Sequence, residues 1–81
     1  MPSPTVENYL KQILLISLER DKKEVGMGLI SEALGVTPGT ATSMVKNLER
    51  EGWLSYKARK GVKLTGAGRK LGMNILRRHR L

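Results

Sequence analysis

The segment from residue 29 to residue 50 contains two short apolar patterns of helical period, separated by only three residues. The first pattern spans 29–34, and Gly35 follows it where helices commonly end in a left-handed residue. Thr37 and Pro38 then supply a hydroxyl N-cap and a proline at the first helical position. A short helix, a tight turn and a second helix are typical of a helix-turn-helix. We predict this motif over residues 29–50.

Each of the two predicted helices should pack through one apolar face. On the first helix we expect that face to comprise Leu29, Ile30, Ala33 and Leu34. Ala33 and Val36 are small and apolar, so they should let the two helices approach closely. On the second helix the spacing i, i+3, i+4, i+7 is filled by Ala41, Met44, Val45 and Leu48.

An amphipathic pattern also precedes the motif. Apolar residues recur at helical spacing over 5–19, with Ser3 or Thr5 as the N-cap and Pro4 in the first turn. After a charged loop, residues 25–27 suit a short strand between a hydrophilic run and a glycine. The sequence therefore predicts a helix and a short strand ahead of the helix-turn-helix.

The period changes from helical to alternating after Gly52. Residues 53–57 and 62–64 are β-prone, and the segment 58–61 between them contains a glycine suited to a hairpin turn. Trp53 directly follows the helix terminator, so we expect it, with Tyr56, to belong to the core. We call the predicted hairpin, residues 53–64, the wing.

A last helix is expected over residues 66–81, capped by Thr65. One face should carry Ala67, Leu71, Ile75 and His79, which are spaced four residues apart. The apolar pattern still runs where the sequence stops, so we expect a fragment or a helix that pairs with a second copy. Either case would expose Leu71, Ile75, Leu76 and Leu81. The order of elements predicts one domain, mainly α with a small β-hairpin: a winged helix-turn-helix.

Charge is distributed unevenly along the 81 residues. Residues 1–34 hold four basic and five acidic side chains, whereas residues 35–81 hold eleven basic and two acidic ones. A solubilising surface would normally intersperse the two signs, and this separation is instead typical of a face that binds a polyanion. We therefore expect a nucleic-acid partner.

The outward face of the second helix of the motif should read that partner. Removing the apolar stripe leaves short hydrogen-bonding residues toward its N-terminus and longer basic ones further along: Thr37, Gly39, Thr40, Thr42, Ser43, Lys46, Asn47 and Arg50. We expect Thr40 and Ser43 to contact base edges in the major groove, and Lys46 and Arg50 to contact phosphates. Thr37 is better explained as the N-cap alone.

The wing adds a second basic element beside the reading helix. Its cationic side chains crowd around the turn: Lys57, Arg59, Lys60 and Lys63. We expect them to grip the DNA backbone or the minor groove. The alternative is an ordinary charged surface hairpin.

Several other classes of protein are disfavoured. The sequence has no cysteine and one histidine, so we expect neither a zinc finger, a disulfide framework nor an enzyme. We predict a cytoplasmic protein without a membrane partner, because the longest apolar run, 13–16, is far too short to span a bilayer. Three aromatic residues are too few for stacking on single strands. Double-stranded RNA is disfavoured because its major groove excludes a helix. A winged-helix protein–protein module remains the alternative.

Several motifs together resemble the N-terminal domain of the diphtheria toxin repressor family, the iron- and manganese-dependent transcriptional repressors. They are Glu7-x-Tyr9-Leu10, Ile30-Ser31-Glu32-Ala33-Leu34, Thr37-Pro38 with Met44-Val45, Leu64-Thr65-x-x-Gly68 and Arg78-His79-Arg80-Leu81. The likeness spans essentially the whole chain. It implies a transcriptional regulator, most simply a repressor, that binds a palindromic operator in double-stranded DNA as a homodimer.

The resemblance also implies a metal site in a longer parent protein, which would bind Mn²⁺ or Fe²⁺. By position, His79 matches a family ligand, and Asn8 falls where members commonly have Asp or Met. Lys11 falls where manganese-type members have Glu. A neutral amide is a poor ligand for these ions and an ammonium repels them. We therefore expect no metal cofactor bound by this chain alone.

Overall fold

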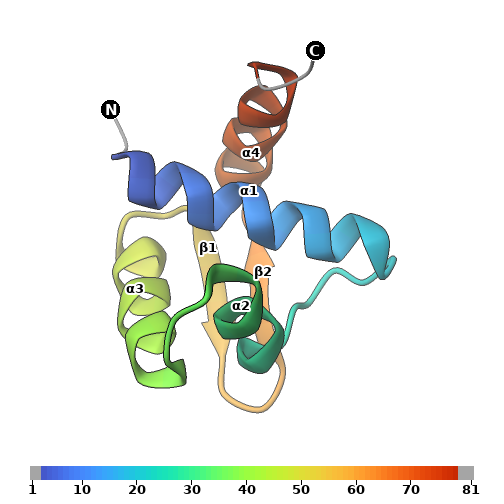
Figure 1. Ribbon diagram of the computed structural model, residues 1–81. Helices are drawn as coiled ribbons and strands as arrows, with labels where there is room; N and C mark the ends of the chain where they lie inside the picture. The colour runs from blue at the N-terminus through green and yellow to red at the C-terminus, as the bar shows by residue number, and fades with distance from the viewer. Residues whose placement is uncertain (1–2, 79–81) are drawn as a thin grey trace.

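The computed structural model describes residues 3–78, and the four helices and one hairpin follow the predicted order. The bounds are α1 Pro4–Glu19, α2 Met27–Leu34, α3 Pro38–Arg50, β1 Leu54–Lys57, β2 Gly61–Leu64 and α4 Gly66–Arg78. Helix α1 crosses the middle of the molecule, with α2, α3 and the hairpin on one side and α4 on the other (Figure 1). The winged helix-turn-helix prediction is confirmed.

Helix α1 begins at Pro4 because Ser3 is the N-cap. The Ser3 hydroxyl accepts a hydrogen bond from the backbone N–H of Val6 at 3.2 Å, which satisfies one otherwise unpaired donor. The helix buries Leu10, Ile13 and Leu14 almost completely. It thus forms the central layer of the core.

The main hydrophobic core is made of side chains from α1, α2, α3, the two strands and Val25. Its buried members are Tyr9, Ile13, Val25, Ile30, Val45, Leu48, Leu54 and Val62. Trp53 and Tyr56 are half-buried and pack against this cluster, as predicted. Burial of each large aliphatic side chain contributes roughly 1.5–3 kcal/mol.

The strand predicted over 25–27 is reduced to one residue. Val25 forms an isolated antiparallel bridge with Val62, with both N–H···O distances at 2.8 Å. Met27 instead begins α2. Gly61 has φ +106° at this bridge, and a Cβ there would lie 2.4 Å from the Val25 carbonyl oxygen, so the close approach requires glycine.

Helix α2 packs through Leu29, Ile30 and Leu34, as predicted, but not through Ala33. Ala33 is exposed and does not mediate the contact with α3, whereas Ser31 is buried at 7% exposure. Ser31 can be buried because its hydroxyl donates to the Gly28 carbonyl at 3.1 Å. Gly35 ends the helix in the left-handed conformation, as predicted. The prediction for Ala33 is wrong because Ser31, whose hydroxyl is hydrogen-bonded within its own helix, occupies the inner position instead.

Helix α4 keeps Leu71 and Ile75 of the expected face but not Ala67. Ala67 is exposed, while Gly68 and Ile75 are buried and Leu71 is half-buried. The expectation that Ile75 would be exposed is wrong, because α4 packs against α1 and covers it. Leu76 is half-buried, and His79 and Leu81 lie outside the described residues.

Gly68 allows α4 to approach the beginning of the hairpin. A Cβ at this position would lie 1.9 Å from the Trp53 carbonyl oxygen. The same junction is held by Thr65, whose hydroxyl donates to the Gly52 carbonyl at 2.7 Å and accepts from the Gly68 N–H at 3.1 Å.

Within residues 3–78, every helix is too short or too polar to cross a membrane.

Candidate nucleic-acid interface

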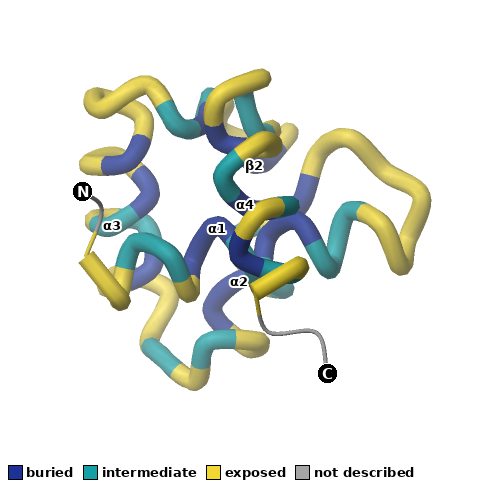
Figure 2. Tube along the Cα trace, turned by 90° about the horizontal axis from the view of Figure 1, so that it is seen from above, coloured by how far each residue is buried: buried dark blue, intermediate teal, exposed yellow. Residues whose placement is uncertain are grey.

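Helix α3 presents one buried and one exposed face. Ala41, Val45 and Leu48 are completely buried, and these three contacts fix the rotation of the helix. The opposite face carries side chains that are all exposed: Gly39, Thr40, Ser43, Lys46, Asn47 and Arg50. Figure 2 shows this division between the inner and outer sides of α3. The hydroxyl and basic residues predicted to read DNA are therefore accessible together.

Thr37 is the N-cap of α3 and also orients Thr40. Its hydroxyl oxygen accepts from the Thr40 N–H at 3.3 Å, and the hydroxyl donates to Oγ1 of Thr40 at 2.9 Å. The Thr40 hydroxyl consequently keeps its own hydrogen available to a partner outside the helix. The predicted capping role of Thr37 is confirmed.

Thr42 lies at the edge of the exposed face rather than on it. The residue is half-buried, and its hydroxyl donates to the Pro38 carbonyl at 2.8 Å. Its hydrogen is used within the helix, in the back-bonding that threonine commonly makes. The structure thus separates Thr42 from Thr40 and Ser43, with which the sequence had grouped it.

Asn47 and Arg50 act as a pair one turn apart. An Arg50 guanidinium N–H donates to Oδ1 of Asn47. The bond uses the amide oxygen of Asn47 and leaves its two amide hydrogens available as donors. The C-terminal half of the α3 face is therefore a preassembled set of N–H donors.

The wing carries four exposed cations around a strained turn. Lys57, Arg59, Lys60 and Lys63 are all exposed. The Lys60 N–H donates to the Lys57 carbonyl at 3.1 Å, and Arg59 occupies the third position of this turn with φ +75°. That conformation favours glycine, so an arginine there has an energetic cost.

Glu49 couples the wing to α3, a role that the sequence analysis did not predict. One carboxylate oxygen of Glu49 accepts from the backbone N–H of Tyr56 at 2.9 Å. A charge-assisted bond of this kind fixes the hairpin edge against the last turn of α3. Contacts seven residues apart across a turn follow no helical or strand period, so periodicity could not have indicated it.

The α3 face and the wing turn lie at the same end of the molecule. In Figure 1, the N-terminus of α3 and the hairpin turn both point downward, and α4 projects from the opposite end. This arrangement aligns the hydroxyl-rich first turns of α3 with the cationic turn. Both elements therefore lie at the end of the molecule opposite to the one from which α4 projects.

The positions assigned to a metal by resemblance do not form a suitable donor set. Asn8 is exposed on α1, Lys11 is half-buried one turn later, and His79 lies outside the described residues. The nearby Glu7 carboxylate is already paired with Arg78 at 3.3 Å. Residues 3–78 contain no group of three His, Cys, Asp or Glu side chains placed to hold an ion. An amide beside an ammonium does not fit a divalent cation.

Comparison with known proteins decides the family. Residues 1–62 match the iron dependent repressor, N-terminal DNA binding domain, family. The chain belongs to this family. The resemblance predicted from the sequence motifs is thereby confirmed, and the family consists of DNA-binding regulators.

Two relatives of this iron dependent repressor domain are both described as the HTH-type transcriptional regulator MntR. The protein from Lysinibacillus sphaericus (strain C3-41) is 38% identical over 81 residues, which are all of this chain and 57% of the relative. The protein from Geobacillus kaustophilus (strain HTA426) is also 38% identical over 81 residues, covering 56% of its length. The chain therefore spans little more than half the length of these relatives.

Solved structures show the same fold. The manganese regulator SloR matches with a TM-score of 0.73 and 33% identity, covering 98% of this chain and 36% of SloR. The crystal structure of ScaR with bound Zn²⁺ matches with a TM-score of 0.71 and 32% identity, covering 98% and 35%. Both matches extend over α4 as well as the helix-turn-helix.

Proposed function

We propose that residues 3–78 act as one sequence-specific DNA-binding domain of a transcriptional regulator, most simply a repressor. One observation carries the proposal: α3 has an exposed face of hydroxyl and basic residues, and its N-terminal end lies at the same end of the molecule as the cationic turn of the wing. Short hydroxyl side chains can reach base edges in a major groove, and the cations beside them can neutralise phosphates. Membership of the iron dependent repressor family supports the same function.

The roles of the exposed residues follow from their length and position. Thr40 and Ser43 stand in the first two turns of α3, where a recognition helix contacts bases. Lys46 and Arg50 lie further along and meet the flanking backbone. The N–H groups at Gly39 and Thr40 can also receive a phosphate at the helix N-terminus.

The wing contributes affinity, and the strain at Arg59 supports that role. A left-handed conformation for arginine costs about 1 kcal/mol relative to glycine, so a side chain is retained there at some loss of stability. A guanidinium at the tip of the turn is well suited to phosphate oxygens.

We further propose that the protein functions in the cytoplasm as a homodimer, without a catalytic activity of its own. The family resemblance supports the dimer, since two copies on a two-fold axis would match a palindromic operator. Sedimentation of the chain alone and with an operator duplex measures this state directly.

The main test is selection of bound sequences from random duplexes, followed by alanine substitution. Thr40→Ala or Ser43→Ala should change which sequence is preferred, whereas Arg50→Ala or Lys60→Ala should weaken all duplexes equally. Each lost phosphate contact lowers the slope of log affinity against log salt by about 0.9. Unchanged binding in all four variants would show that α3 is not the recognition helix.

Arg59→Gly separates function from stability. Glycine relieves the left-handed strain, so the melting temperature should rise while duplex affinity falls. If both quantities fell together, Arg59 would act through the fold and not through DNA.

The alternative, a protein–protein module, predicts a different salt response. Binding through an apolar surface is weakly sensitive to salt, while binding through phosphates is strongly sensitive. Elution from immobilised heparin across a salt gradient therefore discriminates the two functions.

A further inference from the structure

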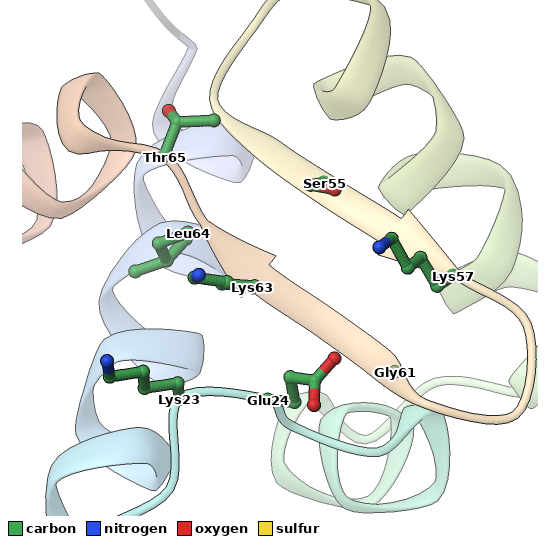
Figure 3. Close-up of a pocket in the computed structure, with 8 residues that line it drawn as sticks. All are labelled: Lys23, Glu24, Ser55, Lys57, Gly61, Lys63, Leu64 and Thr65. Carbon is green, nitrogen blue, oxygen red and sulfur yellow. The ribbon is translucent and has the colours of Figure 1, made fainter.

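The wing has a second face, which points away from the core. Residues pair as Ser55↔Lys63 and Tyr56↔Val62 along the hairpin, so side chains alternate between the two faces. Tyr56 and Val62 point inward, whereas Ser55, Lys57 and Lys63 line a hollow on the outer face (Figure 3).

The loop between α1 and α2 closes one side of this hollow. Lys23 and Glu24 join Lys57 and Lys63 around a cavity of about 420 Å³. An adjoining cavity of about 460 Å³ shares Lys23 and Lys63. Lys22 and Arg69 line only the second cavity. We call the two cavities together the outer trough.

The outer trough carries an excess of positive charge. Five cations line it, namely Lys22, Lys23, Lys57, Lys63 and Arg69, against two carboxylates, Asp21 and Glu24. Within residues 3–78 the one ion pair is Glu7–Arg78, on α1 and α4, so these five cations are not neutralised by ion pairs there. Like charges held around one hollow repel, and an anion bound among them would relieve that repulsion.

The loop that supplies Lys23 is held at both ends. At its start, Asp21 adopts a left-handed conformation with φ +51°, and the Lys22 N–H donates to the Ser17 carbonyl at 3.0 Å. At its end, Val25 is bonded to Val62 on β2. The backbone at Lys23 is thus fixed beside the hairpin before any ligand arrives, which reduces the entropy lost on binding.

We propose that the outer trough binds phosphate groups through Lys23, Lys57 and Lys63. The ammonium groups supply point charges that suit phosphate, and the Ser55 hydroxyl supplies an additional donor. Lys57 and Lys63 belong to the wing as well, so the strand that the wing contacts can continue into the trough. The phosphates are therefore those of DNA that flanks the segment read by α3. This inference rests on the proposed function, but it adds Lys23, which that function does not use.

The experiment measures affinity while a selected duplex is trimmed from its ends. The unmodified chain should lose affinity in a step when the flanking phosphates are removed. Lys23→Gln should lack that step and should bind the long duplex about threefold more weakly, with a salt slope reduced by about 0.9. Lys70→Gln, which removes an exposed charge from α4 outside the trough, is the matched control and should behave like the unmodified chain.

Glu24→Gln should change the affinity for the long duplex in the opposite direction to Lys23→Gln. It removes a carboxylate from the same cavity, so binding of the long duplex should become tighter while binding of the trimmed duplex stays the same. A general effect of net charge would instead tighten both duplexes equally.

A titration with inorganic phosphate identifies the source of the ligand, read from the amide NMR signals of Ser55 and Gly61. If phosphate shifts these signals in the unmodified chain but not in Lys23→Gln, and trimming gives no step, free phosphate is the ligand and the DNA assignment is wrong. If neither assay responds to Lys23→Gln, the trough is not a phosphate site. If no duplex binds at all while phosphate still shifts both signals, the proposed function fails and the phosphate site stands.

Discussion

Helices α3 and α4 have similar N-terminal caps but differ in their surroundings. Both have 13 residues, and each starts after a threonine whose side-chain oxygen accepts the N–H three residues later. Helix α4 is the more basic, with Arg69, Lys70, Arg77 and Arg78 against Lys46 and Arg50 on α3. Yet α3 has exposed hydroxyls, and its N-terminus lies at the same end of the molecule as the wing turn, whereas the Thr65 hydroxyl before α4 donates to the Gly52 carbonyl. The number of positive charges alone therefore does not single out α3, whereas its position and its exposed hydroxyl groups distinguish it from α4.

The largest difference in stability between α3 and α4 should come from replacing one glycine in each helix by alanine. Gly68→Ala places a Cβ 1.9 Å from a backbone oxygen that cannot move cheaply, so unfolding free energy should fall by about 3 kcal/mol. Gly39→Ala meets nothing within 4 Å and should raise stability by about 0.5 kcal/mol, because glycine is a poor helix former. Thermal unfolding followed by circular dichroism measures both, and equal effects would mean that α4 is not fixed at this contact.

The next largest difference in stability should lie between the threonine caps of α4 and α3. Thr65→Ala removes a cap and also the donor to the Gly52 carbonyl, so we expect a loss of about 2 kcal/mol. Thr37→Ala removes an exposed cap alone and should cost about 1 kcal/mol. Urea denaturation gives the two losses of unfolding free energy. A greater loss for Thr37→Ala would mean that the additional bond from Thr65 to the Gly52 carbonyl does not contribute to stability.

A smaller effect should separate the basic side chains. Lys46→Ala should weaken duplexes of all sequences and reduce the salt slope by about 0.9, because one phosphate contact is lost. Lys70→Ala should leave the slope unchanged, since α4 projects away from the α3 surface. Fluorescence anisotropy at several salt concentrations tests the pair. An equal reduction of the salt slope in the two variants would place DNA on both helices.

Added metal should have the smallest effect. Because the described part of α1 offers an amide at Asn8 and an ammonium at Lys11, Mn²⁺ should shift the melting temperature of this chain by less than about 1 °C. Treatment with EDTA is the control and should be equally without effect. A concentration-dependent rise would establish a site that these residues do not explain.

The sequence predicted the element order, the exposed face of α3 and the hairpin, because large aliphatic residues and strong caps specify them. Its errors arose where small or polar residues make the close contacts. Ser31 is buried in place of Ala33, and Gly68 in place of Ala67, since a serine bonded to its own helix or a missing side chain has no apolar signature. The Glu49–Tyr56 bond was likewise invisible, because it depends on tertiary placement.

The contact of Gly68 with Trp53 has a mechanical consequence. The first turn of α4 rests directly on the backbone that joins α3 to β1, without an intervening side chain to absorb movement. A tilt of α4 would therefore press directly on this backbone and would have to move the start of β1 with it.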